Sequence, residues 1–368
     1  MDSDRNKKIF VKVHFLPSLL VFAFVICSCS LDIGQSQTSS PQQNTDETPS
    51  HQGANANVPW ANLNLTGKLI YNAGLMRSEG IYSAIQFLDL STGEVSTVFQ
   101  DLNDGWINDL AVAPSTRFLV MSYTPPANAS IRDALYSIPL DGSQPPQLLF
   151  VPPIDTDQYY QPAWSPDGTY LYFAHFKVQS RVSYEIMRMA YPNGKPEKLV
   201  DDAYWPRLSD DGTRLVYVYI DPATGANLLF FANADGTSPQ NIPLTGLPVP
   251  MIIDAPMFST DNQTILFSSP IKLQASGPTL FDKIMGVAVA AADGTIPSDW
   301  WSVPLSGGEP NQLTHIRSLG LFGSFSPDKN HIASYSTYGI FVMKPDGTGV
   351  NMLVQDVGGI SGTVNWIP

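Results

Sequence analysis

The chain has 368 residues, of which 43% are hydrophobic, 11% aromatic and only 14% charged, a composition typical of a globular protein. Its formal net charge is −13, and a surface of that sign repels a phosphate backbone, so nucleic acid is excluded as an expected partner. The 31 prolines and 27 glycines are spread along the chain, as in folds built from many short strands and tight turns.

The first 28 residues have the pattern of an export signal. Basic residues precede an unbroken apolar run, 19–26, which is far shorter than the roughly 20 residues that span a bilayer. The run leads into Cys27, Ser28 and Cys29, which resemble a bacterial lipobox. The resemblance implies cleavage before Cys29 and lipid attachment to it; an ordinary secretory signal and an uncleaved anchor are the alternatives. Cys27 and Cys29 are the only cysteines, so a lipidated mature chain has no disulfide.

The next segment, 29–58, carries the lipidated cysteine and then reads as a tether. Residues 30–58 contain no Lys, Arg, Trp, Tyr or Phe and many Ser, Gln, Thr, Asn and Pro. Such a segment cannot bury enough apolar surface to offset the entropy of ordering it. We therefore expect a disordered tether with a reach of about 30 Å, followed by a globular body over residues 59–368.

A hairpin motif recurs through this body. An apolar strand ends at Ser or Ala, a polar turn follows, and a second apolar strand begins; the copies lie at 111–121, 163–173, 207–217, 257–267 and 324–334. In the second copy, Pro166 presets one turn residue, Asp167 can accept bonds from nearby N–H groups, and Gly168 supplies a positive φ. We assign these aspartates to the turns rather than to a ligand.

Each hairpin is followed by a further strand, a glycine-containing turn and a short strand, at 135–149, 186–200, 228–242, 300–314 and 340–354. Each unit therefore holds four strands joined by tight turns. In the strand 214–220, apolar side chains occupy both alternating faces. A strand that is buried on both faces lies in a sheet between two other sheets, and four-stranded sheets stacked around an axis meet that demand.

The number of units gives the architecture. Complete units span about 105–150, 158–200, 204–243, 252–314 and 319–354, while residues 67–100 hold three strands of a sixth unit. The segment 362–368 supplies the missing strand, which removes two open sheet edges. We predict an all-β fold, a six-bladed β-propeller of four-stranded antiparallel blades, closed by the C-terminal strand completing the N-terminal blade.

The motifs WSPDG, LSDDG and FSPDK in these units resemble the repeats of TolB-type six-bladed propellers and of the WD-like propeller modules of secreted bacterial proteins. The resemblance covers all six units and implies the propeller fold. Since the TolB family binds partner proteins and lipoproteins at the cell envelope, it also implies a binding role. TolB's N-terminal domain is not apparent, and a lipobox and tether stand in its place, so a TolB-like transport role does not follow.

The expected binding surface is one mouth of the propeller channel. The first strand of each blade lines the axis, and the residues just before its core lie at one end of the channel. The candidate partner-binding residues in that register and beside it are Trp106, Asn108, Asp109, Tyr159, Tyr160, Tyr204, Trp205, Arg207 and Asp254. An aromatic and polar rim is typical of docking surfaces. Alternatively, these side chains close the channel and pack on neighbouring blades.

The fifth unit carries an insertion near 270–299. Extra length in one blade maps to a single face of a propeller, often the functional one. An extended strand pair without a special role is the alternative.

The sequence gives catalysis little support. It contains no G-x-S-x-G, H-E-x-x-H or glycine-rich phosphate loop. His175, His315 and His331 stand in different units without a spaced partner, and we assign each of them to the surface or to a strand end. Some six-bladed propeller enzymes hold an axial metal with carboxylates, but only Asp109 and Asp254 occupy suitable positions here. We expect no enzyme activity, no metal and no cofactor.

Together these features predict a monomeric lipoprotein of the bacterial cell envelope, with its body outside the cytoplasm, periplasmic or extracellular. It would bind a protein, peptide or glycan at the channel mouth, and it would not bind nucleic acid. A propeller hydrolase or lyase with an axial metal ion is the alternative. A sensor or assembly factor for envelope complexes is not distinguished from a binding module.

Overall fold

The computed structural model describes residues 58–368 except 78–79, 104, 127–132, 155–156, 179–181, 247–251, 271–296, 319 and 359–361. The predicted export signal, the lipidation site Cys29 and nearly all of the tether lie outside the described residues. Within them there are 24 strands and one short 3₁₀ turn, η1 (Ala61–Leu63), and no described helix is long and apolar enough to cross a membrane.

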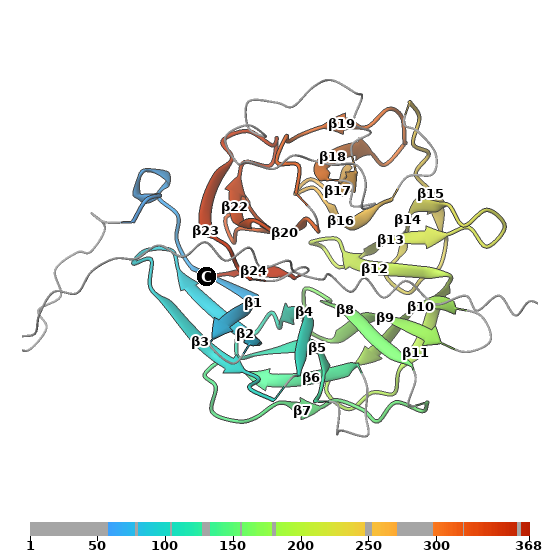
Figure 1. Cartoon of the computed structure of the whole chain (residues 1–368). Helices are drawn as coiled ribbons and strands as arrows, with labels where there is room; N and C mark the ends of the chain where they lie inside the picture. The colour runs from blue at the N-terminus through green and yellow to red at the C-terminus, as the bar shows by residue number, and fades with distance from the viewer. Residues whose placement is uncertain are drawn as a thin grey trace, which may run out of the picture. The chain divides into compact units, whose positions relative to one another are not determined.

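The strands form six four-stranded antiparallel sheets, which we call blades 1 to 6 in chain order (Figure 1). From the axis outward, blade 1 contains β24 (Val364–Ile367), β1 (Lys68–Arg77), β2 (Gly80–Asp89) and β3 (Val95–Gln100). Blade 2 contains β4 (Trp106–Val112), β5 (Phe118–Thr124), β6 (Ala134–Pro139) and β7 (Gln147–Leu148). Blade 3 contains β8 (Gln158–Trp164), β9 (Tyr170–Val178), β10 (Val182–Ala190) and β11 (Glu197–Asp201).

The second half of the chain repeats the arrangement. Blade 4 contains β12 (Ala203–Leu208), β13 (Arg214–Ile220), β14 (Asn227–Asn233) and β15 (Gln240–Asn241). Blade 5 contains β16 (Asp254–Phe258), β17 (Thr264–Pro270), β18 (Ser298–Pro304) and β19 (Asn311–Gln312). Blade 6 contains β20 (Phe322–Phe325), β21 (Ile332–Ser336), β22 (Gly339–Met343) and β23 (Asn351–Gln355).

The innermost strands close a ring. Each contacts the next in the order β4, β8, β12, β16, β20, β24 and back to β4, and Figure 1 shows the blades set around that common axis. The C-terminal strand β24 pairs antiparallel with β1, with Leu69 opposite Trp366. The predicted six-bladed propeller and its closure by the C-terminal strand are both confirmed.

The core lies between the blades, because each sheet is covered on both faces. On β13, Val216 and Val218 pack in a cluster with Ile265 of blade 5. On its other face, Leu215 packs in a cluster with Tyr172 of blade 3. The doubly apolar strand pattern was therefore a correct indicator of stacked sheets.

The turn between β8 and β9 is held as its sequence predicts. The Ser165 hydroxyl donates to Asp167 Oδ1 at 2.6 Å, the backbone N–H of Thr169 donates to the same oxygen at 3.0 Å, and Gly168 has a φ of +72°. These hydrogen bonds to the carboxylate lower the pKa of Asp167 to about 2, and the bond from Ser165 has the largest effect. The aspartate thus serves the turn.

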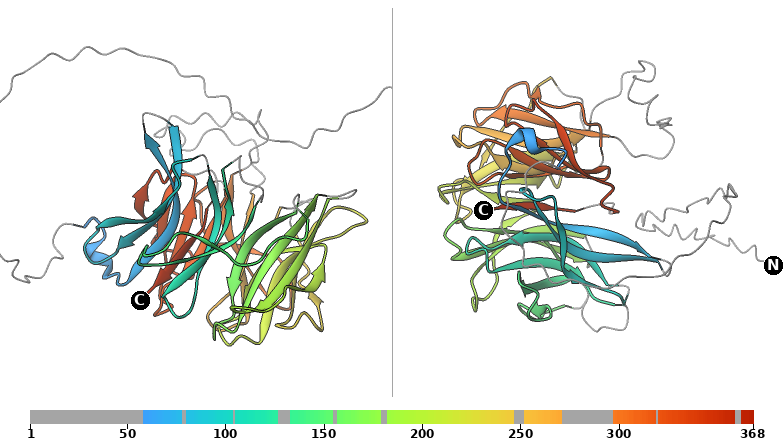
Figure 2. Two further views of the ribbon diagram at one scale, coloured as in Figure 1. Left: turned by 90° about the horizontal axis from the view of Figure 1, so that it is seen from below. Right: turned by 90° about the vertical axis from the view of Figure 1, so that its left-hand side faces the viewer.

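The ring has two faces, and the left view of Figure 2 shows the ring from its edge. We call the end where the innermost strands begin the mouth face, and the end that carries the turns after those strands the turn face. On blade 5, β17 ends at Pro270 and β18 begins at Ser298, and Asp254 at the start of β16 pairs with Ser268. The predicted insertion is therefore attached at the mouth face, although its residues 271–296 lie outside the described ones.

Candidate functional site

A chain of hydrogen bonds links the innermost strands of blades 2 to 5 at the mouth face. Asp109 Oδ2 on β4 accepts the backbone N–H of Gln161 on β8 at 3.1 Å. Gln161 Oε1 accepts the backbone N–H of Trp205 on β12 at 2.8 Å. The Trp205 indole Nε1–H donates to Asp254 Oδ1 on β16 at 3.2 Å. We call these four residues the mouth relay; three of them, Asp109, Trp205 and Asp254, are candidates from the sequence, and Gln161 joins them.

A bulge in the innermost strands makes this relay possible. The register of β8 with β9 shifts between Tyr160 and Ala163, and that of β12 with β13 shifts between Tyr204 and Arg207. Within these bulges, Gln161 and Trp205 both have a φ of +56°. A bulge takes one residue out of the ladder and re-aims its groups. The freed N–H groups then bond to the neighbouring blade, which offsets the cost of a left-handed backbone at residues other than glycine.

Arg207 links three blades beside the relay. Its guanidinium carbon lies 4.2 Å from the centre of the Phe322 ring on β20, and the ring of Trp205 is centred 5.7 Å from the same phenylalanine. Arg207 therefore reaches from blade 4 to blade 6, and its charge also acts on Asp109 of blade 2. These contacts match the expected alternative in which the rim side chains close the channel.

The charges at the axis have lost much of their water. Burial raises the pKa of Asp109 to about 6, and the Gln161 N–H and the Arg207 charge only partly counter this effect. Burial likewise lowers the pKa of Arg207 to about 10, against the opposing influence of Asp109. The pKa of Asp254 is raised by burial, with the Trp205 hydrogen bond acting in the opposite direction.

The other rim candidates on blades 2 and 3 are half-buried and bonded within the mouth face. Asn108 Nδ2 donates to Thr124 Oγ1 at 3.1 Å, and the Tyr160 hydroxyl donates to the buried carboxylate of Asp133. Trp106 opens β4 and is also half-buried. These residues lie where the sequence places them.

Tyr204 begins an aromatic series on the same face. Its hydroxyl accepts a hydrogen bond from Asn227 Nδ2 at 3.2 Å and donates to the backbone oxygen of Ile253 at 3.4 Å. Its ring is centred 5.2 Å from the ring of Tyr184 on β10. Tyr184 was not among the candidates, because it lies on β10, the third strand of its blade from the axis, rather than on the innermost strand.

Tyr159 differs from the expectation. Its side chain is 2% exposed, and its ring stacks on His175 with centres 4.6 Å apart and on the edge of Phe150. Tyr159 therefore packs between blades 2 and 3, whereas the hydroxyl of the neighbouring Tyr160 bonds to Asp133.

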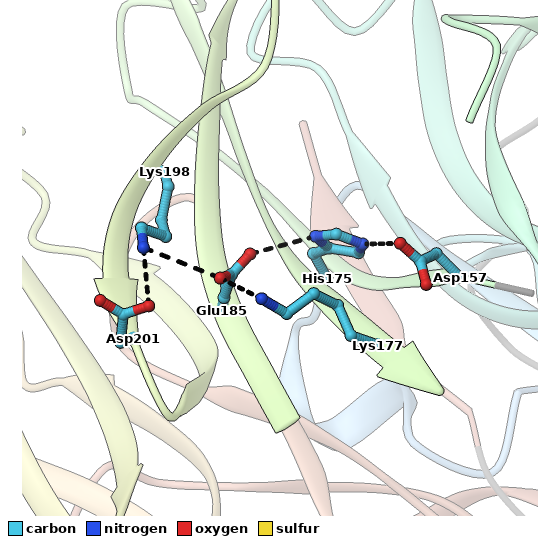
Figure 3. Close-up of polar contacts among 6 residues, drawn as sticks. All are labelled: Asp157, His175, Lys177, Glu185, Lys198 and Asp201. Atoms are coloured by element: carbon cyan, nitrogen blue, oxygen red, sulfur yellow. Dashed lines mark hydrogen bonds and ion pairs between the residues drawn. The ribbon is translucent and has the colours of Figure 1, made fainter. Parts of the chain in front are cut away.

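His175 corrects a second expectation, because it lies in a buried charged cluster and not at the surface (Figure 3). Its Nε2 is 2.9 Å from Asp157 Oδ2 and its Nδ1 is 3.3 Å from Glu185 Oε2. Lys177 and Lys198 both contact the Glu185 carboxylate. The strand pairing could have revealed the cluster, since His175 stands opposite Glu185 in the hairpin of β9 and β10. His315 is exposed, as expected, and His331 is half-buried.

Two further features bear on ligand binding. Among the described residues, no group of three His, Cys, Asp or Glu side chains is placed to hold a metal ion. On the turn face, a groove of about 520 Å³ opens between blades 3 and 4, lined among others by Asp167, Tyr170, Arg188 and Asp211. Its aspartates are already engaged by the turns, so the groove offers polar walls rather than free ligands.

Comparison with known proteins gives the fold. No protein-family model matches the chain, and no curated protein matches its sequence. Among solved structures, TolB from Acinetobacter baumannii superposes with a TM-score of 0.55 at 15% identity, covering 82% of this chain and 67% of that one. A putative TolB from Agrobacterium tumefaciens gives 0.53 at 16% identity, over 83% and 99% of the two chains. A chain of a nidogen–laminin complex gives 0.53 at 8% identity, over 81% and 98%. The body of the protein is thus a TolB-type six-bladed propeller in fold.

Proposed function

From this TolB-type fold, we propose that the protein is a binding module that holds a protein, peptide or glycan on its mouth face. The observation that carries the proposal is the collection of half-buried aromatic side chains there from blades 2, 3 and 4; they are Trp106, Tyr160, Tyr184, Tyr204 and Trp205. Tryptophan and tyrosine dominate the energetics of binding surfaces because they bring a large apolar area and a polar group together.

The mouth face is the better candidate for a binding surface, because more of its side chains are available to a partner than those of the turn face. On the turn face, aspartates such as Asp167 and Asp211 accept the hydrogen bonds that build their own turns. On the mouth face, the aromatic rings are only partly covered, and the longest connection within any blade, that of blade 5, is attached there. Long connections on a rigid scaffold are where propellers commonly carry recognition.

We further propose that the binding module is tethered to a bacterial membrane through lipid on Cys29. The lipobox-like segment before this cysteine and the composition of residues 30–58 support the proposal. Cys29→Ser should release the protein from the membrane fraction and abolish labelling by an alkyne analogue of palmitate. Cys27→Ser is the matched control and should leave both unchanged; loss of labelling in Cys27→Ser alone would contradict the assignment.

The docking face is best tested by photocrosslinking in native envelope. A benzophenone amino acid at position 106 or 204 keeps an aromatic ring at the mouth face, and the same group at the exposed Lys195 probes the turn face. We expect a partner adduct from positions 106 and 204 and none from 195. Equal adducts from both faces, or adducts from 195 alone, contradict the proposal. Truncation of Trp205 is less informative, because this residue also joins blades 3, 4 and 5.

The proposal assigns no catalysis, and the metal content of the protein tests that point. A propeller hydrolase or lyase with an axial ion would carry a stoichiometric metal after purification without chelators. We expect a substoichiometric content by elemental analysis; one Ca²⁺, Mn²⁺ or Zn²⁺ per chain would overturn this part of the proposal.

A further inference from the structure

Three aromatic rings form a continuous row on the mouth face. Phe176 and Tyr184 of blade 3 have ring centres 4.8 Å apart, and Tyr184 and Tyr204 of blade 4 have centres 5.2 Å apart. All three rings are half-buried, so each keeps part of its surface open to solvent. We call them the aromatic row.

The row ends at the carboxylate of Asp254 on blade 5. The Tyr204 hydroxyl bonds the backbone of Ile253, the preceding residue, and Asp254 itself accepts the indole N–H of Trp205. Burial raises the pKa of Tyr184 and of Tyr204, and the negative charge of Asp254 raises both further. Both hydroxyl groups therefore lie within the electrostatic field of Asp254. One carboxylate and three aromatic side chains therefore converge from three blades.

This carboxylate has no counter-ion in the part of the chain that the structure describes. Its single bonding partner is the neutral indole N–H of Trp205, and no described Lys or Arg lowers its pKa. Arg207 is stacked on Phe322, and the carboxylate that its charge acts on is that of Asp109. A carboxylate that has lost water without gaining a cation is costly for the free protein, and a ligand cation would remove that cost.

The surrounding carboxylates also favour a cationic ligand. Asp109 and Asp254 belong to the mouth relay, and the buried Asp101 and Asp133 accept the tyrosine hydroxyls of Tyr123 and Tyr160. Of these carboxylates, Asp109 is the one on which the charge of Arg207 acts. A cleft lined by one sign of charge concentrates ligands of the other sign, and the faces of aromatic rings attract cations as well.

We propose that the mouth face recognises a lysine or arginine side chain of a peptide segment, with its charge placed on Asp254 and its stem along the aromatic row. The inference rests on the proposed function, since it names the chemistry that a partner must present at that face. A neutral glycan could stack on the same rings, but it would leave Asp254 without a counter-ion.

The test uses the intact globular protein, Ac-Arg-Arg-Arg-NH₂ as a probe, and the citrulline tripeptide of the same shape without the charge. By calorimetry at physiological salt, we expect the arginine peptide to bind about tenfold more tightly than the citrulline peptide. Asp254→Asn keeps the acceptor for Trp205 and should weaken the arginine peptide about fivefold or more. Asp261→Asn removes the same charge from the turn face of the same blade and should change affinity by less than about twofold.

A second variant separates recognition from the overall negative charge. Tyr184→Leu removes one ring of the aromatic row without changing any charge, and it should weaken the arginine peptide several-fold. Equal binding of the two peptides, equal loss in Asp254→Asn and Asp261→Asn, or no loss in both Asp254→Asn and Tyr184→Leu would overturn the inference. In each of these cases, adducts from positions 106 and 204 would still support the proposed function, so the two failures are distinguishable.

Discussion

Thr363 and Leu110 lie 253 residues apart in the chain and exchange two hydrogen bonds. Thr363 Oγ1 accepts the Leu110 N–H at 2.9 Å and donates to the Leu110 oxygen at 3.1 Å. Asn365 accepts the Val112 N–H at 3.1 Å, and the Thr363 N–H donates to Asn72 Oδ1 at 2.7 Å. The C-terminal strand is therefore bound to β4 of blade 2 as well as to β1, its partner within blade 1.

Deletion of residues 362–368 should consequently damage the whole ring rather than one sheet edge. It removes Trp366, which is 7% exposed and packed between blades 1 and 6, and it exposes Leu69 and Tyr71. Loss of a buried tryptophan alone costs about 3–5 kcal/mol. We expect the thermal transition to become broad and to fall by more than about 10 °C. Deletion of the exposed Pro368 alone is the control, and a sharp, unshifted transition in the longer deletion would disprove the closure.

The His175 cluster should stabilise the fold through its buried members and hardly at all through its exposed ones. Asp157→Ala removes a carboxylate with a 2% exposed side chain from the ring nitrogen of His175, at a cost of about 2–4 kcal/mol. Asp201→Ala removes a carboxylate with a 66% exposed side chain from Lys198, at a cost below about 1 kcal/mol. Urea denaturation measures the free energy of unfolding of both variants. Similar losses in the two variants would show that burial is not what gives the cluster its effect.

The raised pKa of Asp109 makes a specific contribution to the pH dependence of stability. The folded chain holds this proton up to about pH 6 and the unfolded chain only to about pH 4. The folded state thus binds more protons between these values, and this contribution to stability falls as the pH rises from 4 to 6. At pH 7 the cost is at most about 3 kcal/mol. Asp109→Asn should therefore gain stability relative to the wild type as the pH rises.

The measurement is the free energy of unfolding of both proteins in urea at pH 4.5 and pH 7. The difference between Asp109→Asn and the wild type should change by about 2 kcal/mol over that interval. Asp261→Asn is the control, because the pKa of Asp261 is lowered, chiefly by Ser259, and its contribution is lost only below about pH 4. A constant difference for Asp109→Asn would mean that its carboxylate remains hydrated.

Arg207 and Asp109 should be strongly coupled. Arg207→Met keeps an apolar stem over Phe322 but leaves Asp109 without its cation, so we expect a loss of about 2–4 kcal/mol at pH 7. The double variant Arg207→Met/Asp109→Asn removes both charges and should recover more than about 1 kcal/mol of that loss. A double-mutant cycle in urea measures the coupling. Additive effects would place the two charges in separate environments.

The repeating elements were predictable because their causes are local. A Ser-x-Asp-Gly-Thr turn carries its own donors and acceptor, as Ser165, Asp167 and Thr169 show. Apolar residues at consecutive positions indicate which strands are covered on both faces, and β13 confirmed this with clusters on either side.

The bulges of the innermost strands were not predictable in the same way. Gln161 and Trp205 adopt a positive φ although neither is glycine and each precedes a proline, which ordinarily favours an extended backbone. Their conformation is stabilised by partners on other blades, Asp109 and Gln161 respectively. The role of His175 was missed for a related reason, because Asp157 and Glu185 reach it only through the pairing of three strands.

The sequence by itself determined the six four-stranded units, their tight turns and the C-terminal strand that completes blade 1. Each of these features depends on residues that are close in the chain or on a pattern that is repeated along it. Only the tertiary structure decided that Asp109, Arg207 and Phe322 meet at the axis and that Asp254, at the end of the aromatic row, has no cation beside it among the described residues. Periodicity fixes the face of a strand on which a side chain lies. Which side chains meet across the axis depends on how six twisted sheets close a ring, and on the bulges that this closure imposes on the innermost strands.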